Sequence, residues 1–503
     1  MFCKLNSYSL NGVDALPIDV EVDLHDGLPG FDIVGLPDCA VKEAKERVKS
    51  AIKNSDFSFP ICHITVNLAP ADIKKEGSLY DLPIALGILC CLGIFPSSAL
   101  EKNYFIGELA LDGTLRGVRG LLPLLCAMED TSKCIIPIAN EEEASLIDFV
   151  DIKLAHHLKE VVSYIKGEQS LAICKKSPSL SKPISKVLDF ADVKGQESAK
   201  RGLMLCAAGY HNTILIGAPG SGKTMLARRL PSILPPLSEK QSIEVTKIYS
   251  VAHQLNEYQI IKDRPFRSPH HTISTLGLTG GGSHPKPGEI SLAHLGVLFL
   301  DELLEFNKHT LEILRQPLEE HQITLSRSQS SITYPANFLF LASTNPCPCG
   351  YYPDHKKCSC SLPSIRKYLS KLSGPLIDRI DIHLETHVPS VTDLTSSTSL
   401  TSSDMKDYVM IAKKRQDKRY QGTTISYNSQ IPPSAIKTFC NLSSGAKKLL
   451  TEWFEHTNSS IRAYDKILRL ALTIADINQT NQIDVPHIAE AIQYRILDRQ
   501  FWV

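Results

Sequence analysis

One eight-residue segment, GAPGSGKT at residues 217–224, constrains the fold of this chain more than any other segment. It matches the phosphate-binding P-loop pattern G-x-x-x-x-G-K-[ST] at every defined position. An apolar strand pattern (213–216) precedes it and a helical pattern (225–230) follows it, as the motif requires. A glycine-rich turn that matched the motif by chance would not need this strand and helix around it. We therefore expect an α/β fold with a nucleotide site. The eight residues of that site are Gly217, Ala218, Pro219, Gly220, Ser221, Gly222, Lys223 and Thr224.

Two acidic residues at the end of a later apolar strand supply the second half of such a site. The run GVLFL at 296–300 leads directly into Asp301 and Glu302. Lys223 is expected to reach the β- and γ-phosphates of ATP, while the Thr224 hydroxyl and Asp301 hold Mg²⁺. Glu302 is expected to orient and polarise the attacking water. The alternative is that the two acids only cap a helix.

A third apolar strand, FLFLAST at 338–344, ends at Asn345 and Pro346. Neighbouring parallel strands deliver their polar residues to the same carboxyl edge of a sheet. Asn345 is therefore predicted to help position the water near the γ-phosphate. An isolated asparagine before proline would otherwise be a turn residue.

The composition places these motifs in a long and electrically balanced chain. Its 503 residues are enough for about three domains. The 54 Lys+Arg equal the 54 Asp+Glu, which excludes a uniformly basic nucleic-acid coat but allows a local basic patch. The most apolar window, 83–96, is too short to cross a bilayer, and no secretory signal is visible. We expect a cytoplasmic protein with mostly free thiols and no membrane contact.

Four of the fourteen cysteines fall within fourteen residues. Cys347, Cys349, Cys358 and Cys360 form two Cys-x-Cys pairs separated by eight residues, a pattern that suits a four-thiolate metal site, first of all structural Zn²⁺. His355 is an alternative ligand. The Cys-x-Cys pair is tighter than the usual Cys-x₂-Cys pair, so four free thiols are the alternative interpretation.

With the segment LIDRID at 376–381, the motifs resemble the AAA+ ATPase core of the magnesium-chelatase-like and MCM-like branch. In that branch the arginine of this segment acts on the γ-phosphate bound by a neighbouring subunit. The resemblance therefore implies that Arg379 is an arginine finger and that the site lies between subunits. An ion pair of Arg379 with Asp378 or Asp381 of the same chain is the alternative.

The helical pattern that begins at Ser460 resembles the lid helix of the same branch, whose arginine senses the nucleotide phosphate. Arg462 stands at the matching position, and the resemblance implies that it contacts the nucleotide. Arg469, two turns later, is the alternative, as a solvated arginine.

Two insertions are candidates for DNA contact. The segment 322–334 (QITLSRSQSSITY) is typical of a hairpin and resembles one that projects into the central channel of such rings. Arg327, near its tip, is our DNA-contact candidate, and a solvated tip is the alternative. The glycine-rich segment 276–288 is expected to be a mobile pore loop. The basic segments 262–271 and 413–419 could attract nucleic acid, although such runs usually form a solvated face.

The N-terminal region narrows the resemblance to one family. The segments GFDIVGLP (30–37), VNLAPAD (66–72) and GELALDG (107–113) resemble the ComM/YifB family. This resemblance implies four regions. They are a Lon-protease-like α+β domain of the S5 type (1–172), a linker (173–187), a magnesium-chelatase-type AAA+ core (188–392) and a C-terminal helical lid (393–503).

The family resemblance also implies the function. Its members are understood as ATP- and Mg²⁺-dependent DNA helicases, homo-oligomers in hexameric rings, that promote branch migration on single-stranded or branched DNA during natural transformation. We expect no peptide cleavage, because Leu79 stands at the Lon nucleophile position and Leu122 near that of its lysine. Ser78 lies directly beside Leu79.

Two other functions remain open. A chelatase-type or MoxR-like ATPase that remodels a protein partner would share the core, but by family description chelatase ATPase subunits lack the fused N-terminal domain. An ATP-dependent Lon-like protease would need the missing catalytic pair. Stimulation of ATP hydrolysis by DNA would favour the DNA motor over both.

Overall fold

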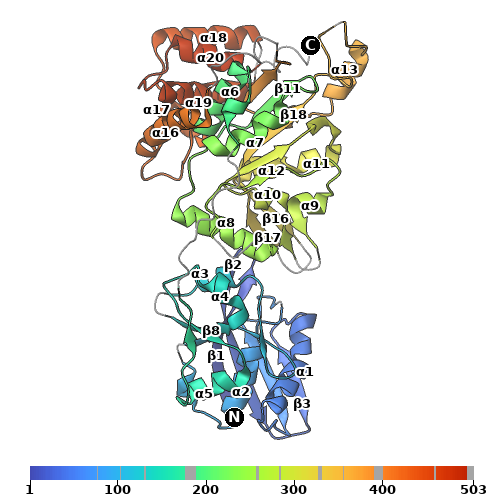
Figure 1. Cartoon of the computed structure of the whole chain (residues 1–503), viewed down its shortest axis with the longest axis vertical. Coiled ribbons are helices and arrows are strands. Elements are labelled where there is room, and N and C mark those ends of the chain that lie inside the picture. The colour runs from blue at the N-terminus through green and yellow to red at the C-terminus, as the bar shows by residue number, and fades with distance from the viewer. Residues whose placement is uncertain are drawn as a thin grey trace.

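The computed structural model describes residues 1–75, 77–101, 103–129, 132–175, 188–255, 260–282, 285–326, 331–354, 356–389, 400–457 and 460–495. These residues form three parts, which we call the N-terminal module (β1 to β10), the P-loop module (α6 to β19) and the helical module (α16 to α20). The N-terminal module lies at one end of the long axis, and the helical module lies at the other end beside the P-loop module (Figure 1). None of the described helices is long and apolar enough to cross a membrane.

The N-terminal module is built on an eight-stranded mixed sheet with strand order β10-β9-β8-β5-β1-β2-β4-β3. Its strands alternate buried and more exposed residues because one face packs on helices. The elements are β1 (Phe2–Asn11), β2 (Asp14–His25), β3 (Gly30–Val34), α1 (Cys39–Asn54), β4 (His63–Ala69), α2 (Asp81–Cys91), β5 (Asn103–Phe105), β6 (Glu108–Leu109), β7 (Leu115–Arg116), α3 (Leu121–Cys126), β8 (Lys133–Pro137), α4 (Glu141–Ala144), β9 (Asp151–Ala155), α5 (Leu158–Ile165) and β10 (Ala172–Ile173).

Local sequence signals explain the two main helices of this module. The Asp38 carboxylate accepts a hydrogen bond of 2.8 Å from the Val41 N–H and so caps α1. Helix α2 overlaps the apolar window 83–96 and is buried along nearly its whole length, so this apolar stretch belongs to the core of the module. Its one ionised residue, Asp81, is paired with Arg47 at 2.7 Å. Burial raises the pKa of Asp81 to about 6, although Arg47 opposes this rise.

The P-loop module contains a five-stranded, all-parallel sheet with strand order β12-β15-β18-β11-β19. The predicted α/β fold is therefore confirmed for this part of the chain. The elements are α6 (Glu197–Gly209), β11 (Thr213–Gly217), α7 (Lys223–Ile233), α8 (Glu239–Ala252), β12 (Phe266–Arg267), α9 (Thr275–Thr279), β13 (Gly280–Gly281), β14 (Lys286–Pro287), α10 (Glu289–Leu292), β15 (Val297–Leu300), α11 (Lys308–Ile313), α12 (Arg315–Glu320), β16 (Gln322–Ser326), β17 (Ser331–Pro335), β18 (Leu339–Thr344), α13 (Leu362–Leu369), α14 (Gly374–Ile377) and β19 (Ile382–Thr386).

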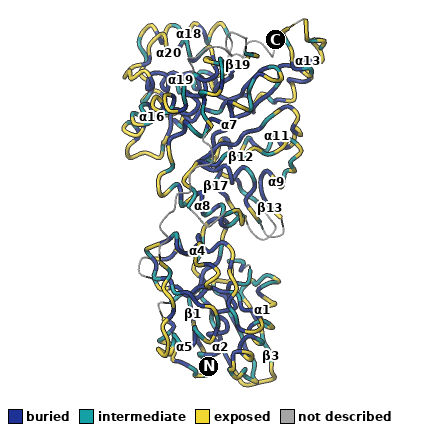
Figure 2. The backbone as a smooth tube through the Cα atoms, viewed as in Figure 1, coloured by how far each residue is buried: buried dark blue, intermediate teal, exposed yellow. Residues whose placement is uncertain are grey.

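Both faces of this sheet are covered, because alternate residues of its strands pack into two different cores. One core joins Leu215 and Phe299 to α6, α7 and the helical module. The other joins Ile216 and Leu298 to α10, α11, α12, α13 and α14. Figure 2 shows the resulting band of buried chain through the module. Such two-sided burial explains why the strands are continuous apolar runs.

The structure confirms the predicted hairpin and corrects the prediction for the glycine-rich segment. The hairpin forms as β16 and β17, which pair from Gln322 opposite Pro335 to Ser326 opposite Ser331. Its tip, with Arg327, lies outside the described residues. The glycine-rich segment was expected to be a loop, but it contains α9 and the short ribbon β13–β14, with residues 283–284 outside the description.

The helical module comprises α16 (Ser402–Arg419), α17 (Ile436–Phe439), α18 (Ser444–Thr457), α19 (Ile461–Ile477) and α20 (Val485–Gln493). Buried Asp476 on α19 organises its polar interior. The carboxylate accepts hydrogen bonds from Arg419 at 2.8 Å and from Asn428 at 2.9 Å, and it also pairs with Arg415 at 3.3 Å. Much of the predicted basic run at 413–419 is thus used in ion pairs within the chain.

Two arginines of the second basic segment, 262–271, also form contacts inside the molecule. The buried Arg264 side chain donates to the backbone carbonyls of Pro235 and Leu295. Arg267 forms a two-pronged ion pair with Glu289, with both N–O distances at 2.6 Å. These two arginines therefore stabilise the fold and do not form a surface for nucleic acid.

The N-terminal module contacts the P-loop module through the turn between β1 and β2. Val13 at this turn packs with Ile248 of α8, Leu292 of α10 and Tyr334 of β17 in a small apolar cluster. The Glu143 carboxylate accepts a hydrogen bond from the Ser250 hydroxyl across the same junction. The hairpin β16–β17 is thus held at its base by the N-terminal module.

The carboxylate of Asp476 provides a stability test. Replacing Asp476 with Ala leaves the partly buried guanidinium groups of Arg415 and Arg419 without their partner, so we expect a loss of about 3 kcal/mol in the unfolding free energy of the helical module. Urea unfolding followed by tryptophan fluorescence measures this, since Trp453 and Trp502 are the only tryptophans of the chain. The control is Asp417→Ala, which removes an exposed ion pair with Lys413 and should cost less than about 1 kcal/mol. Equal losses in both variants would contradict the role of Asp476.

Candidate nucleotide-binding site

The P-loop lies at the carboxyl end of β11 and leads directly into α7. Gly220 and Gly222 have φ values of 78° and 85°, which glycine adopts without strain. Gly217 has no room for a side chain, because a Cβ atom there would lie 2.4 Å from the Thr386 carbonyl oxygen. This loop geometry at the start of a helix is suited to binding phosphate.

The Lys223 ammonium is folded back onto the loop. Its Nζ donates to the carbonyl oxygens of Gly217 at 2.7 Å and Ala218 at 3.0 Å, and to Asn345 Oδ1 at 3.2 Å. Burial lowers the pKa of Lys223, while the nearby Asp301 and Glu302 oppose this shift. The structure thus brings the predicted lysine and the predicted asparagine into direct contact.

Thr224 and Asp301 also meet as predicted. The Thr224 hydroxyl donates to Asp301 Oδ2 at 2.7 Å. A hydroxyl and a carboxylate at this spacing are the oxygen donors that Mg²⁺ uses beside nucleotide phosphates, so the residues present fit that ion. The P-loop and the end of β15 therefore form one site.

Ser343 on β18 is a site residue that sequence reasoning missed. Its hydroxyl donates to Asp301 Oδ1 and accepts a hydrogen bond of 3.1 Å from the Glu302 N–H. It therefore fixes both the carboxylate of Asp301 and the backbone that carries Glu302. Its position on the predicted strand, two residues before Asn345, is the one sequence feature that could have indicated a role at the site.

Glu302 has a left-handed backbone with a φ value of 53°, and its side chain is 57% exposed. Its carboxylate lies 3.8 Å from His271 Nδ1. The His271 ring lies close to that of His270, with 4.1 Å between centroids, and has an edge contact with Phe306. His271 comes from the segment after β12, and the sequence placed it only in the basic segment 262–271, with no role at the nucleotide site.

Arg379 and Arg462 lie at the opposite edge of the sheet from the P-loop. Asn212 precedes β11, and its carbonyl accepts a hydrogen bond of 2.7 Å from the Asp381 N–H. The Asn212 side chain donates to the Arg379 carbonyl at 3.1 Å. These contacts fix the segment before β19 at the amino edge, whereas the P-loop follows β11 at the carboxyl edge.

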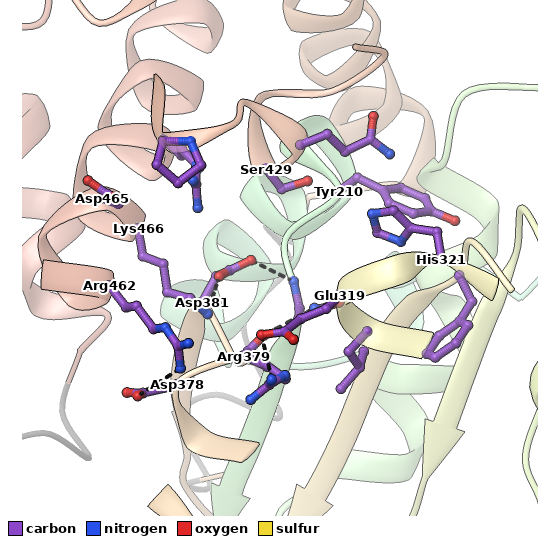
Figure 3. A pocket seen from close by; sticks show the side chains of 16 residues that line it. Tyr210, Glu319, His321, Asp378, Arg379, Asp381, Ser429, Arg462, Asp465 and Lys466 are labelled. Carbon is purple, nitrogen blue, oxygen red and sulfur yellow. Dashed lines mark hydrogen bonds and ion pairs between the residues drawn. The ribbon is translucent and has the colours of Figure 1, made fainter. Parts of the chain in front are cut away.

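The two arginines line one cavity of about 340 Å³ at this edge (Figure 3). Arg379 forms an ion pair with Glu319 of α12, and its side chain is 10% exposed. Arg462 lies 3.8 Å from Asp378. Asp381 instead pairs with Lys466 at 2.7 Å. Arg379 thus forms an ion pair within its own chain, as the alternative expected, but its partner is Glu319 and not Asp378 or Asp381.

Burial controls the charges in this cavity. Desolvation alone would raise the pKa of Asp381, but Lys466 and His211 lower it well below its usual range. Burial lowers the pKa of Lys466 to about 8, against the attraction of Asp381. Arg469, the alternative to Arg462, is partly buried and lines the same cavity.

The four predicted cysteines gather in one place. All four Sγ atoms lie within 4.8 Å of one another. The Sγ of Cys347 lies 3.3 Å from that of Cys349 and 3.8 Å from that of Cys358, and Cys349 and Cys358 are 3.6 Å apart. Tetrahedral Zn²⁺ with bonds of about 2.3 Å places its sulfur ligands about 3.8 Å apart, so these residues fit that ion. His355 lies outside the described residues.

The residues that the sequence resemblance matches to a Lon catalytic site lie in a different chemical setting here. Leu79 and Leu122 are both buried. The Ser78 hydroxyl donates to the Glu108 carboxylate. Lys75 is buried and donates to the Pro70 carbonyl, and burial lowers its pKa. The hydrogen bond found for Ser78 therefore leads to an acid, not to a lysine.

A second cavity of about 640 Å³ lies between this region and the P-loop module. Basic side chains from both modules line it. Burial lowers the pKa of His253, and the positive charges of Arg119 and Lys286 lower it further. The basic lining residues are Lys74, Arg119, His253 and Lys286, and the acidic residues Asp72 and Glu108 also line the cavity.

The parallel sheet, P-loop and acidic strand end define a P-loop nucleotide-binding protein. Three family profiles match the chain: "Magnesium chelatase, subunit ChlI" at 189–394, "Subunit ChlI of Mg-chelatase" at 20–140 and "Magnesium chelatase, subunit ChlI C-terminal" at 399–495. These matches place the chain in the AAA+-like, magnesium-chelatase class, which indicates ATPase activity with nucleotide and Mg²⁺.

Full-length relatives define the family further. The chain is 44% identical to "Uncharacterized protein YifB" of Escherichia coli (strain K12) over 492 residues, which cover 97% of this chain and 96% of the relative. It is 41% identical to "Competence protein ComM" of Haemophilus influenzae over 495 residues, with the same coverage. The chain therefore belongs to the YifB/ComM family. A "Magnesium-chelatase 38 kDa subunit" of Rhodobacter capsulatus is 26% identical over 193 residues, 35% of this chain and 55% of the relative.

The hydrogen bonds of Ser343 lead to a test of its role. Ser343→Ala removes the group that holds Asp301 and Glu302, so we expect ATP hydrolysis to fall at least roughly tenfold while nucleotide affinity changes little. Steady-state ATPase assays and equilibrium binding of a fluorescent ATP analogue separate the two effects. The control is Ser291→Ala, which removes an equally buried hydroxyl that has no hydrogen-bond partner. Unchanged hydrolysis in Ser343→Ala would refute this role.

Proposed function

We propose that this chain is the subunit of an ATP-driven DNA-translocating motor, a helicase that promotes branch migration during homologous integration of DNA in natural transformation. The observation that carries the proposal is the separation of Arg379 from the P-loop of its own chain across the width of the sheet. A finger at that edge cannot serve its own nucleotide, so the motor is a homo-oligomeric ring, taken as a hexamer from the family resemblance.

The proposed chemistry follows from the site. Lys223 leaves the loop carbonyls for the β- and γ-phosphates of ATP, and Thr224 and Asp301 hold Mg²⁺. Glu302 orients the attacking water, with Asn345 beside the γ-phosphate. Arg379 of the neighbouring subunit stabilises the transition-state charge, an effect of roughly 10³-fold or more in other P-loop enzymes. Arg462 shares its cavity and is proposed to contact the same neighbouring nucleotide.

Two observations support DNA as the substrate of the motor. The full-length relative from Haemophilus influenzae is named a competence protein. The cavity beside the hairpin β16–β17 contains groups that can bind phosphate, including Arg119 and Lys286. We propose that DNA follows this path and that Arg327 contacts its backbone. The N-terminal module is then a Lon-like domain without peptide cleavage that contributes to DNA contact or assembly in the cytoplasm.

The sulfur geometry supports a structural Zn²⁺ site at Cys347, Cys349, Cys358 and Cys360. We include this ion in the proposed function as a structural component. It has no proposed step in ATP hydrolysis.

A chelatase-type or MoxR-like ATPase that remodels a protein partner is the second candidate. The matches to magnesium-chelatase profiles favour it. The limited coverage of the chelatase subunit, 35% of this chain, argues against it. Under this second function, DNA would leave ATP hydrolysis unchanged.

Branch migration on a labelled three- or four-way junction tests the motor. Wild type with ATP and Mg²⁺ should convert the junction, and DNA should stimulate its ATPase. Lys223→Ala should lose ATP binding, and Glu302→Gln should bind ATP but lose hydrolysis by at least roughly 100-fold, so neither variant should convert the junction. Absence of junction conversion and of DNA-stimulated ATPase in wild type would favour the second candidate.

Mixed rings test the proposed position of Arg379. Rings of Arg379→Ala alone and of Lys223→Ala alone should be inactive. Their mixture should regain ATPase activity, because an intact P-loop of one variant then meets an intact Arg379 of the other. The control is Arg315→Ala, which removes an arginine of the same module that pairs with Glu312. If Arg379→Ala rings keep full activity, Arg379 is not the finger.

A further inference from the structure

The cysteine site and the nucleotide site share one loop. This loop joins β18 to α13, begins at Asn345 and contains all four cysteines. Asn345 accepts a hydrogen bond from Lys223, and Cys347 follows it by only two residues. A change in the cysteine site therefore acts on a segment that directly contacts the P-loop lysine.

A second contact joins the loop to the P-loop itself. Gly350 lies against Pro219, and a Cβ atom at Gly350 would be 2.5 Å from Pro219 Cδ and 3.7 Å from Asn345 Cγ. The φ value of Gly350 is 86°, a conformation that side chains disfavour. This glycine allows the loop to support Pro219 from one side, between the two Cys-x-Cys pairs.

Within its described residues, the loop has no helix or strand between β18 and α13. The conformation of the loop then depends on contacts of its side chains. One of these is the hydrogen bond of 3.3 Å that the Sγ of the buried Cys347 accepts from the Tyr352 N–H. Four thiolates bound to one ion would cross-link the two ends of the cysteine segment and reduce its conformational freedom. Four neutral thiols attract one another only weakly.

We propose that metal binding at the cysteine tetrad positions the P-loop through Asn345 and Gly350, so that ATP affinity depends on occupancy of the metal site. Asn345 and Gly350 act here as positioning residues, through Lys223 and Pro219 respectively. The inference rests on the Zn²⁺ site proposed above, but not on DNA as the substrate.

The test uses the purified full-length chain and has two readouts that need no DNA. Zinc content is measured by mass spectrometry of the metal, and affinity by equilibrium binding of a fluorescent ATP analogue with Mg²⁺. Wild type should carry one zinc ion per chain. The double variant Cys358→Ser, Cys360→Ser should lose the ion and bind the nucleotide roughly tenfold more weakly. The control Cys39→Ser changes an exposed free cysteine and should retain both properties.

Gly350→Ala separates positioning from general loss of structure. It keeps all four cysteines but places a methyl group against Pro219, so it should retain zinc and still lose affinity by roughly tenfold. Its control is Gly422→Ala, where φ is 80° but a Cβ atom would meet nothing within 4 Å. Thermal unfolding of each variant verifies that it is folded.

Two results would overturn the proposal. One is wild-type protein that binds no zinc when purified or after zinc addition. The other is unchanged nucleotide affinity in folded Gly350→Ala or in the zinc-free cysteine variant. If only the proposed DNA-motor function is wrong, the result differs. DNA junctions would then stay unconverted, while zinc content and nucleotide affinity would still change as predicted above.

Discussion

The parallel pairing of β11 with β18 on one side and β19 on the other is the constraint on which the rest of the site depends. Because all strands of this sheet run in one direction, the segments that follow them meet at one edge. That edge brings together the P-loop, Asp301 and Asn345. The same pairing sends the segment before β19, with Arg379, to the other edge. One sheet therefore separates the nucleotide-binding groups from the proposed finger.

Much of this site could be predicted because its motifs are local. The P-loop needs glycines at fixed spacing, and an apolar strand that ends in acids is visible in the seven consecutive residues 296–302. The strand register then makes Lys223, Asp301 and Asn345 neighbours, although they are far apart in the sequence. The four cysteines were also visible, since their spacing is short.

Other features depend on tertiary contacts that no local pattern carries. Glu319 lies sixty residues before Arg379 in the chain, so its ion pair could not be predicted from the LIDRID segment. Ser343 resembles any small residue of a buried strand until its hydrogen bond with Asp301 is known. Arg264 and Arg419 looked like parts of basic surfaces. In the structure Arg264 donates to backbone carbonyls, and Arg419 pairs with Asp476. The glycine-rich segment formed α9 and a ribbon because its apolar residues, such as Leu278, reach a core.

The position of β11 in its sheet also has a consequence for synthesis of the chain. Its neighbour β18 begins at Leu339 and its other neighbour, β19, ends at Thr386, far beyond Gly217. At about 5–20 residues per second, roughly 10–30 s pass before a ribosome has made both partners. The eight-stranded sheet of the N-terminal module is complete much earlier, at Ile173. A nascent chain therefore has a folded N-terminal module while the apolar strand that carries the P-loop still lacks both neighbours, and this strand depends on protection from aggregation during that interval.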